Sequence, residues 1–503
     1  MAYVRTVKTA SGATAVQIVW SSRGGSRKIE HLGSAHDEVG VAALKAAGAQ
    51  KIAAGQDQLD LGLDAPVDAE PLPITSSRAQ HLWEALSDVY DALGFDEATG
   101  DDEVFRQLVA ARIIEPTSKV DSLRVIEEAG ITPVTYPTLN RRLPVFAKPS
   151  FRQGISTACA AHAQLGPTSL VLFDVSTLFF ETDAGDGFRE PGFSKERRLE
   201  PQITLGLLTD ASGMPLMVQA FEGNKAETAT MLPVITAFKT AHQIADVTVV
   251  ADAGMISEAN QIALQAAGLT YVLGSRIPQL PYVVTEWLET HPGQEIPDGL
   301  ILTQPWPSST SEKARGIPDR MIHYQYRADR ARRTLRGIDE QVAKAQRAVD
   351  GKAPVKRNRY IQLTGATKSV NRTLEAKTRA LAGWKGYTTN LTSKPATFII
   401  EAYHRLWRIE KAFRMSKHDL AARPIYHRTR ESIDAHLTIV FAAMAISHYI
   451  ETHTGWSIKK FVRTARRYRT VTIAVGDQTL AAADPIPVDL ATALAKIRSS
   501  GAH

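Results

Sequence analysis

The pattern of apolar and polar positions changes twice along the chain. Residues 1–70 begin with short alternating segments, broken at 22–26, and continue into an alanine-rich helix. Residues 76–165 have helical spacing, and from Ser169 onward short apolar runs between turn-forming residues predict strands. We therefore expect a small α+β unit, then a helical region, then a mixed sheet.

Four apolar runs predict most of this sheet. Residues 171–175 and 247–251 are typical of buried strands, and 202–208 and 214–221 flank the turn sequence 210–213, which predicts a hairpin. The remaining elements are a second segment at 178–181, a loop at 182–200, a helix from Glu227, a helix capped by Ser257 that ends at Gly268, and a strand at 271–273.

Two carboxylates accompany the buried runs. Asp174 lies in Val171-Leu172-Phe173-Asp174-Val175, and Asp252 follows Val249-Val250-Ala251. A carboxylate at the end of a buried strand is costly unless a cation or hydrogen bonds compensate its charge. The order of the elements places the two strands side by side, so the two carboxylates are expected to share a cation.

A third acidic residue, Glu410, belongs to a predicted helix. Its apolar positions recur every three or four residues, as expected for a helix packed on a core: Ile399, Ala402, Leu406, Ile409 and Phe413. Tyr403, Glu410 and Lys417 are spaced by seven residues, so on one continuous helix they share a second face, which Arg414 joins. The alternative is an ordinary amphipathic helix with a Glu–Arg pair on a solvated face.

These residues resemble a family signature, Tyr-x2-Arg-x3-Glu-x6-Lys, of DDE transposases from bacterial insertion sequences. Tyr403, Glu410 and Lys417 match it, whereas Leu406 occupies the arginine position and Arg405 stands beside it. Further blocks similar to one subgroup span roughly residues 165–450: Leu406-Trp407-Arg408-Ile409-Glu410, Ala412-Phe413-Arg414, Arg423-Pro424-Ile425-Tyr426-His427, Ala435-His436-Leu437 and Gly223-Asn224.

The resemblance implies a fold and an activity. It implies an α/β, ribonuclease-H-like mixed-sheet catalytic core interrupted by an insertion domain, with an N-terminal, mostly helical region. Asp174, Asp252 and Glu410 are then ligands of Mg²⁺, for which Mn²⁺ substitutes, in DNA cleavage and strand transfer. The expected partners are double-stranded DNA, from transposon ends and target, and a second copy in a homodimer. Residues expected near the DNA are Tyr403, Arg405, Arg414, Lys417, Asn224 and Lys225.

The spacing of the acidic residues indicates an insertion. Asp252 follows Asp174 by 252 − 174 = 78 residues, and Glu410 follows Asp252 by 410 − 252 = 158. Residues 327–379 contain 15 Lys or Arg and 5 Asp or Glu, a balance of +10, which leaves 6 − 10 = −4 for the rest of the chain. The basic helix there is a candidate DNA-binding surface, and a solvated helix is the alternative. Its candidate contacts are Arg330, Arg332, Arg333 and Arg336.

The expected domains follow from these patterns. They are a small α+β unit (1–75), a helical, possible DNA-binding domain (76–165), the first part of the core (166–280), the basic insertion (281–384), the second part of the core (385–460) and a C-terminal tail (461–503). Within the helical domain, residues 118–143 have the pattern of two helices joined at Gly130. Either Asn140-Arg141-Arg142 faces DNA as in a helix-turn-helix, or the pair is generic.

Composition and the chain start exclude other classes. With one cysteine there is no intramolecular disulfide and no cysteine zinc site. The first residues lack the apolar region of a signal peptide, and the most apolar stretch, 437–446, is too short for a bilayer, so a cytoplasmic protein without a membrane partner is expected. Three other functions stay open: a tyrosine-type recombinase using Tyr403, an inactive DNA-binding relic of a transposase, and glycoside hydrolysis by paired carboxylates.

Overall fold

The protein forms two compact units in the computed structural model. The structure describes residues 2–9, 12–21, 27–53, 72–165, 169–182, 184–192, 199–242, 244, 247–255, 258–314, 319–354, 357–364, 367–475 and 478–500. One unit comprises Met1–Ser76 and Val471–Ala482, and the other comprises Ser77–Thr470 and Ala483–His503.

The smaller unit is built on an antiparallel sheet. Its strands are β1 (Ala2–Lys8), β2 (Thr14–Ser21) and β3 (Arg27–Ala35), and α1 (Glu38–Ala53) packs on β2 and β3. Val16, Ile18 and Val19 of the middle strand are buried. The break expected at residues 22–26 lies outside the described residues.

A second small sheet has the strand order β16-β15-β4. It consists of β4 (Ile74–Arg78), β15 (Thr470–Val475) and β16 (Gln478–Ala483). Strands β15 and β16, with α17 (Ile458–Ala465) and α18 (Val488–Ser500), occupy the part of the chain that we expected to be a tail.

The larger unit begins with six helices. They are α2 (Gln80–Ala92), α3 (Phe95–Thr99), α4 (Glu103–Ile114), α5 (Lys119–Glu128), α6 (Tyr136–Phe146) and α7 (Pro149–His162). Ser118 and Thr135 cap α5 and α6, and Gly130 between them has φ +82°, as a turn between two helices requires. Arg142, one of the expected DNA-facing residues, is ion-paired with Asp102, which caps α4.

An eight-stranded mixed sheet follows, with the order β10-β11-β14-β9-β8-β5-β6-β7. Its first strands along the chain are β5 (Ser169–Phe179), β6 (Gln202–Asp210), β7 (Pro215–Glu222), β8 (Val247–Ala251) and β9 (Thr270–Ser275). The predicted hairpin is confirmed as β6 and β7, and β8 and β9 run parallel to β5. The segment expected at 178–181 is partly a continuation of β5.

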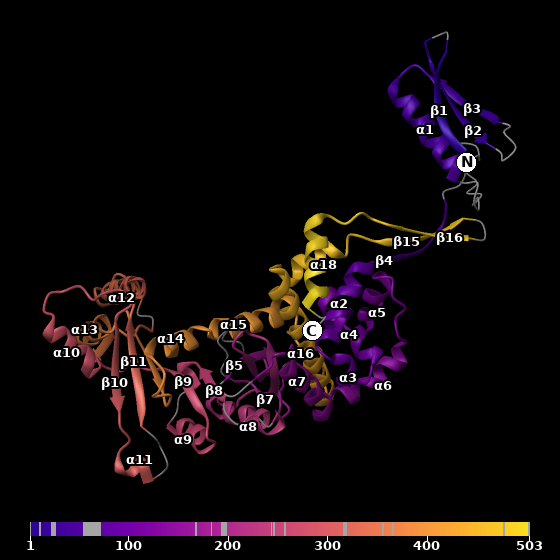
Figure 1. Cartoon of the computed structure of the whole chain (residues 1–503). Helices are drawn as coiled ribbons and strands as arrows, with labels where there is room; N and C mark the ends of the chain where they lie inside the picture. The colour runs from indigo at the N-terminus through magenta and orange to yellow at the C-terminus, as the bar shows by residue number, and fades with distance from the viewer. Residues whose placement is uncertain are drawn as a thin grey trace. The chain divides into compact units, whose positions relative to one another are not determined.

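Helices cover both faces of this sheet (Figure 1). The two faces are distinguished by alternate residues of β5: Val171 and Phe173 pack with α8 (Met231–His242), and Leu172 packs in the other core with α16 (Arg430–Thr454). The first core also includes Leu264 of α9 (Glu258–Ala266). The expected helix from Glu227 starts as a short 3₁₀ turn, η1 (Glu227–Ala229), before α8, and Ser257 lies outside the described residues.

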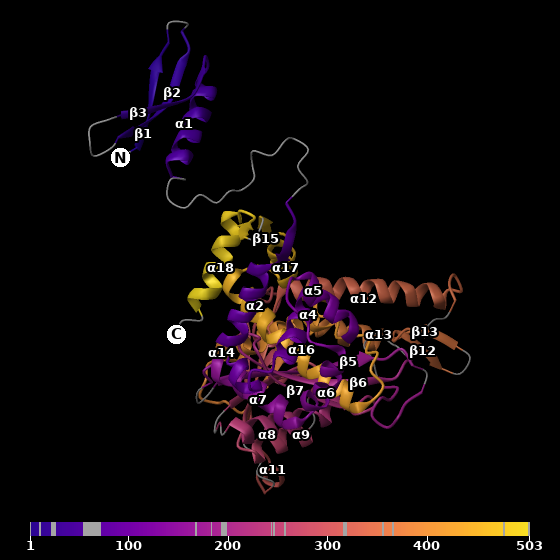
Figure 2. The same ribbon diagram turned by 90° about the vertical axis from the view of Figure 1, so that its right-hand side faces the viewer.

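The first strands of the expected insertion belong to the large sheet. After α10 (Tyr282–Thr290), strand β10 (Ile301–Trp306), helix α11 (Thr310–Ala314) and strand β11 (Arg320–Tyr326) are followed by α12 (Ala328–Val349), the long helix in Figure 2. The hairpin β12 (Ile361–Thr364) and β13 (Thr367–Val370) leads to α13 (Arg372–Ala380). Strand β14 (Trp384–Thr389) then pairs with β11 on one side and β9 on the other.

Helix α16 is longer than the apolar stretch 437–446. Its 25 residues are long and apolar enough to cross a membrane by length and composition, but 89% of the most apolar window is buried inside the protein. Its neighbours include α4, α6 and α18. This burial is typical of the central helix of a helical core.

Candidate catalytic site

Strand register brings Asp174 and Asp252 together. Strands β5 and β8 are parallel, and their paired residues run from Ser169 and Val247 to Phe173 and Ala251. Asp174 and Asp252 are the residues that directly follow this last pair. Asp174 is half-buried and its Oδ1 accepts a hydrogen bond of 2.8 Å from the Val175 backbone N–H, while Asp252 is exposed. The predicted neighbouring placement of these two residues is therefore confirmed, but Asp174 lies inside β5, which continues to Phe179, and only Asp252 lies at the end of a strand.

Tyr403 contacts Asp252. It lies on α14 (Ala396–His404), is only 4% exposed, and its hydroxyl donates a hydrogen bond of 2.5 Å to Asp252 Oδ1. The ring passes close to the backbone of Gly274 in β9, where an added Cβ would lie 2.6 Å from the Tyr403 oxygen. Burial and the bond to Asp252 raise the pKa of Tyr403 far above its usual value, so the phenol remains a donor.

Lys385 of β14 completes the surroundings of the phenol, and sequence reasoning missed it. Its Nζ lies 4.3 Å from the centre of the Tyr403 ring. Burial lowers the pKa of Lys385, and the negative charges of Asp252 and Glu410 oppose this shift. The available signal was a single lysine in the otherwise uncharged segment Trp384–Thr389.

Glu410 lies on a separate helix, which corrects the expected continuous one. Helix α14 ends at His404 and α15 (Leu406–Arg414) begins after Arg405, and a π-helical segment, η3 (Met415–Asp419), follows. Because Arg405 interrupts the helix, a spacing of seven residues does not by itself define one face. Tyr403 is buried and Glu410 is exposed, yet the charge of Glu410 acts on the pKa of Tyr403, so both lie near the same site and the shared helix face stays a prediction. The predicted apolar stripe, Ile399, Ala402, Leu406, Ile409 and Phe413, is buried as expected.

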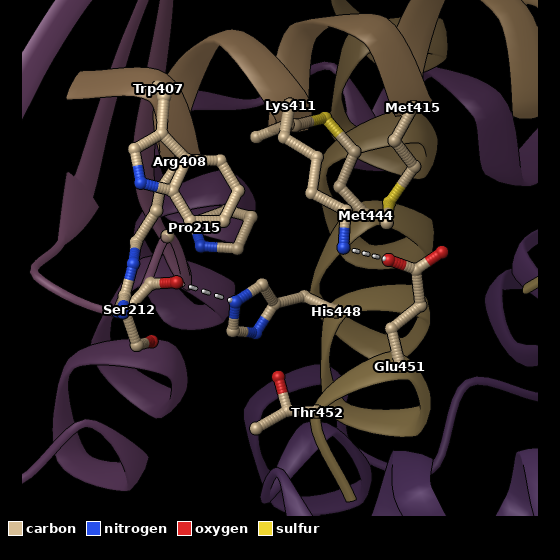
Figure 3. A pocket seen from close by; sticks show the side chains of 12 residues that line it. Ser212, Pro215, Trp407, Arg408, Lys411, Met415, Met444, His448, Glu451 and Thr452 are labelled. Carbon is tan, nitrogen blue, oxygen red and sulfur yellow. Dashed lines mark hydrogen bonds and ion pairs between the residues drawn. The ribbon is translucent and has the colours of Figure 1, made fainter. Parts of the chain in front are cut away.

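Helix α15 is held against the sheet by its other face (Figure 3). Arg408 donates a hydrogen bond of 2.8 Å to the Ala211 carbonyl in the turn between β6 and β7. Lys411 forms an ion pair of 2.6 Å with Glu451 of α16, and His448 of α16 donates to the Ser212 carbonyl at 3.2 Å. These contacts surround a pocket of about 240 Å³ and fix the helix that carries Glu410.

The ligand chemistry suits a hard divalent cation, since carboxylate oxygens are the donors that Mg²⁺ and Mn²⁺ prefer. Glu410 influences the pKa of both Tyr403 and Lys385, so its charge acts on the surroundings of Asp252. Within the described part of the chain, no group of three His, Cys, Asp or Glu side chains lies close enough to hold a metal ion. The structure thus defines a pair of carboxylates, with Glu410 on a neighbouring helix.

The other expected DNA contacts are spread over four places. Arg405 lies half-buried between α14 and α15, Arg414 is exposed at the end of α15, and Lys417 is half-buried in η3. Asn224 is exposed after β7, and Lys225 beside it forms an ion pair of 3.4 Å with Glu222.

Of the four α12 arginines, Arg330 has a structural role. Its Nη1 donates to the backbone carbonyls of Gln325 and Gly383, both at 3.2 Å, and so ties α12 to β11 and to the start of β14. Arg332, Arg333 and Arg336 are exposed, although Arg332 is ion-paired with Asp329 of its own helix.

The fold and the site define a mixed α/β protein with two acidic residues side by side on parallel strands. A family model described as a transposase DDE domain matches residues 166–446. The match covers more than half of the 503 residues, and the chain belongs to this family.

Two further comparisons add no argument about function. No curated protein matches the chain. Among solved structures, the chain is similar to a piggyBac transposase synaptic complex with hairpin DNA, solved by cryo-electron microscopy, at 12% identity and a TM-score of 0.36, over 81% of this chain and 74% of that one.

Proposed function

We propose that the protein is a DNA transposase of the insertion-sequence branch with the Tyr-x2-Arg-x3-Glu-x6-Lys signature. It binds the ends of its own element, cleaves phosphodiester bonds and joins the resulting 3′-OH ends to target DNA, acting as a homodimer on DNA. The observation that carries this proposal is the register of β5 and β8, which makes Asp174 and Asp252 neighbours. The sheet order β7-β6-β5-β8-β9, with β6 antiparallel and β8 and β9 parallel to β5, supports a ribonuclease-H-like core.

Asp174 and Asp252 would hold the cation, with Glu410 as the third carboxylate. Bound Mg²⁺ would supply a water of lowered pKa and stabilise the leaving 3′ oxygen. Tyr403 orients Asp252 by donating a hydrogen bond to Oδ1. Lys385 supplies a positive charge beside the phenol, where it favours the approach of an anionic backbone.

In this proposal three parts of the protein bind DNA: the segment around Glu410, the residues that follow β7, and the exposed face of α12. Arg405, Arg414 and Lys417 lie along the segment that carries Glu410, and Asn224 and Lys225 follow β7. Arg332, Arg333 and Arg336 offer three exposed guanidinium groups on α12, which suit phosphate contacts. Arg330 is left out because its Nη1 already donates to two backbone carbonyls.

We expect Asp174→Asn, Asp252→Asn and Glu410→Gln each to lower cleavage by at least about a hundredfold, because each removes a negative charge that would hold the cation. The measurement is single-turnover cleavage, with Mg²⁺, of DNA that flanks the protein's own coding region. A chelator should have the same effect on the wild type. Binding of the DNA ends and the melting temperature should change little.

Glu401→Gln is the matched control, since Glu401 is an exposed carboxylate on α14, close in sequence to Glu410. It should cleave like the wild type. Substantial cleavage by all three site variants would eliminate the assignment.

A further inference from the structure

A basic cavity of about 650 Å³ lies apart from the carboxylate pair. It is lined by two chain segments far apart in sequence: residues 112–119, from the end of α4 to the start of α5, and residues 421–436, which lead into α16. Four of its lining residues are Arg or Lys, namely Arg112, Lys119, Arg423 and Arg428. Among the described residues that line it, none is Asp or Glu.

Arg112 is the feature that requires an explanation. Its side chain is largely buried at the cavity, and within the described part of the chain no hydrogen bond or ion pair compensates it. Burial alone lowers the pKa of Arg112 to about 10, so it remains charged at neutral pH. A buried cation without a partner is costly to the fold, and a bound anion would remove that cost.

The two histidines of the cavity are neutral and add no further positive charge. Burial, followed by the charges of Lys119 and Arg112, lowers the pKa of His427 to about 4. Burial and the charge of Arg112 also lower the pKa of His436 well below its usual value, and its Nε2 donates to the Ala422 carbonyl at 3.2 Å. Both rings are therefore neutral near pH 7, and Nδ1 of His436 and the His427 ring remain polar groups beside the cations.

Two helices also begin at the cavity. Ser118, the N-cap of α5, and Thr429, the N-cap of α16, both line it. The first backbone N–H groups of a helix carry partial positive charge and favour anions. The positive side chains and the helix starts thus act in the same direction.

We propose that this cavity binds a phosphate group of the DNA backbone, at a position distinct from the bond that is cleaved. This inference rests on the proposed function for the identity of the DNA. A phosphodiester matches the requirement for a compact anion that accepts several hydrogen bonds, and the guanidinium of Arg112 is suited to bind two of its oxygens.

The position of the cavity gives an approximate distance from the carboxylate pair. Ile425 of the cavity wall donates its backbone N–H to the Phe179 carbonyl at 3.1 Å, and Phe179 ends β5, five residues after Asp174. Five residues of strand span about 17 Å. If one DNA strand runs along β5 from the cleaved bond, with a rise of 3.4 Å per nucleotide, this distance corresponds to about five nucleotides.

The first experiment measures binding of the flanking DNA without any metal, so that its result is independent of cleavage. We expect Arg112→Met to lower affinity by roughly tenfold or more and the slope of log affinity against log salt by about 0.9, as one lost phosphate contact predicts. We also expect its melting temperature to be unchanged or higher, because the variant removes an uncompensated buried charge.

The control is Arg498→Met, which removes one positive charge from a side chain already paired with Glu84 and Asp88. It should leave the slope unchanged. Unchanged affinity and slope in Arg112→Met, or a lower melting temperature with unchanged affinity, would overturn the proposal and give Arg112 a purely structural role. If Arg112→Met does not fold, Arg428→Met tests the same slope from an exposed side chain of the wall.

The second experiment locates the phosphate. Single methylphosphonate substitutions, which remove one backbone charge, are placed at successive positions from the cleaved bond. We expect one strong loss near the fifth nucleotide in the wild type and no loss there in Arg112→Met, since the two changes remove the same contact. A pattern identical in both proteins would overturn the proposal. Competition by inorganic phosphate as strong as by the duplex would identify a free anion as the ligand and also overturn it.

Discussion

At the scale of single residues, the contact between Tyr403 and Asp252 changes what the signature means. The sequence placed the phenol on an open face with Glu410, yet the structure buries it and directs its hydroxyl at a strand-end carboxylate. The placement of Asp174 and Asp252 on neighbouring strands was predictable, because a run of apolar residues indicates a buried strand. The position of Tyr403 was not, because a rotation angle along a helix assumes that the helix continues.

Tyr403→Phe tests this role. The phenyl ring fills the same buried space, so folding should be retained, but Asp252 loses one donor. We expect cleavage to fall by about tenfold, as for loss of one hydrogen bond to a charged group, and to remain measurable. The measurement is single-turnover cleavage, followed by a denaturing gel that detects protein joined to DNA.

A tyrosine recombinase would give the opposite pattern. Its nucleophile must lose a proton, whereas burial and Asp252 raise the pKa of Tyr403 and keep the proton on the phenol. Complete loss of cleavage in Tyr403→Phe, with a covalent adduct in the wild type, would establish that rival.

At the scale of elements, the interruption at Arg405 has a tertiary cause. Residues 396–419 contain no Gly or Pro that would end a helix, so the sequence predicted one helix. The structure anchors α14 through Tyr403 to the end of β8, and α15 through Arg408 to the turn after β6. These contacts with two different points of the sheet accompany the interruption, and local propensity does not encode them.

The close approach of α14 to β9 requires Gly274. An added Cβ would lie 2.6–3.0 Å from the oxygen and ring of Tyr403, closer than atoms pack. We expect Gly274→Ala to lower the free energy of unfolding by about 1–3 kcal/mol, as overpacked cores do, and to slow cleavage by moving the phenol away from Asp252. Denaturant unfolding and single-turnover cleavage measure the two effects.

Gly337→Ala provides the control, because a Cβ there meets nothing within 4 Å and the residue lies inside α12. It should raise the free energy of unfolding by about 0.5–1 kcal/mol through helix propensity. Equal and neutral effects at both glycines would contradict the crowding at Tyr403.

At the scale of the whole molecule, the basic insertion has two parts that the sequence did not separate. Charge identified the basic segment, but strand pairing over long sequence distances is not visible in composition, so the joining of β10, β11 and β14 to the sheet was missed. Residues 328–382, by contrast, leave the sheet and return to it at one place: Tyr326 pairs with Trp384, and the Arg327 N–H donates to the Gly383 carbonyl at 3.0 Å. This excursion has a small core of its own around Ile338, Val342 and Tyr360.

The excursion can therefore be removed without breaking the sheet. We replace residues 328–382 by an Asn-Gly turn, which suits a two-residue hairpin between β11 and β14. The deleted segment contains 14 Lys or Arg and 5 Asp or Glu, so the net charge falls from +6 to 6 − 9 = −3. We expect a folded protein that binds the flanking DNA far more weakly and with a smaller salt slope, because the phosphate contacts of α12 are lost.

The catalytic residues are all retained in this variant, so cleavage should persist at low salt and high protein concentration. The comparison variant keeps the excursion but carries Arg332→Ala, Arg333→Ala and Arg336→Ala, which removes three exposed charges and leaves the bonds of Arg330 intact. If the exposed face of α12 binds DNA, it should reproduce part of the loss, up to about 2.7 in the salt slope. If the deletion variant binds DNA like the wild type, the excursion is a solvated surface. If the deletion variant does not fold while the triple variant binds DNA normally, the excursion serves the stability of the protein.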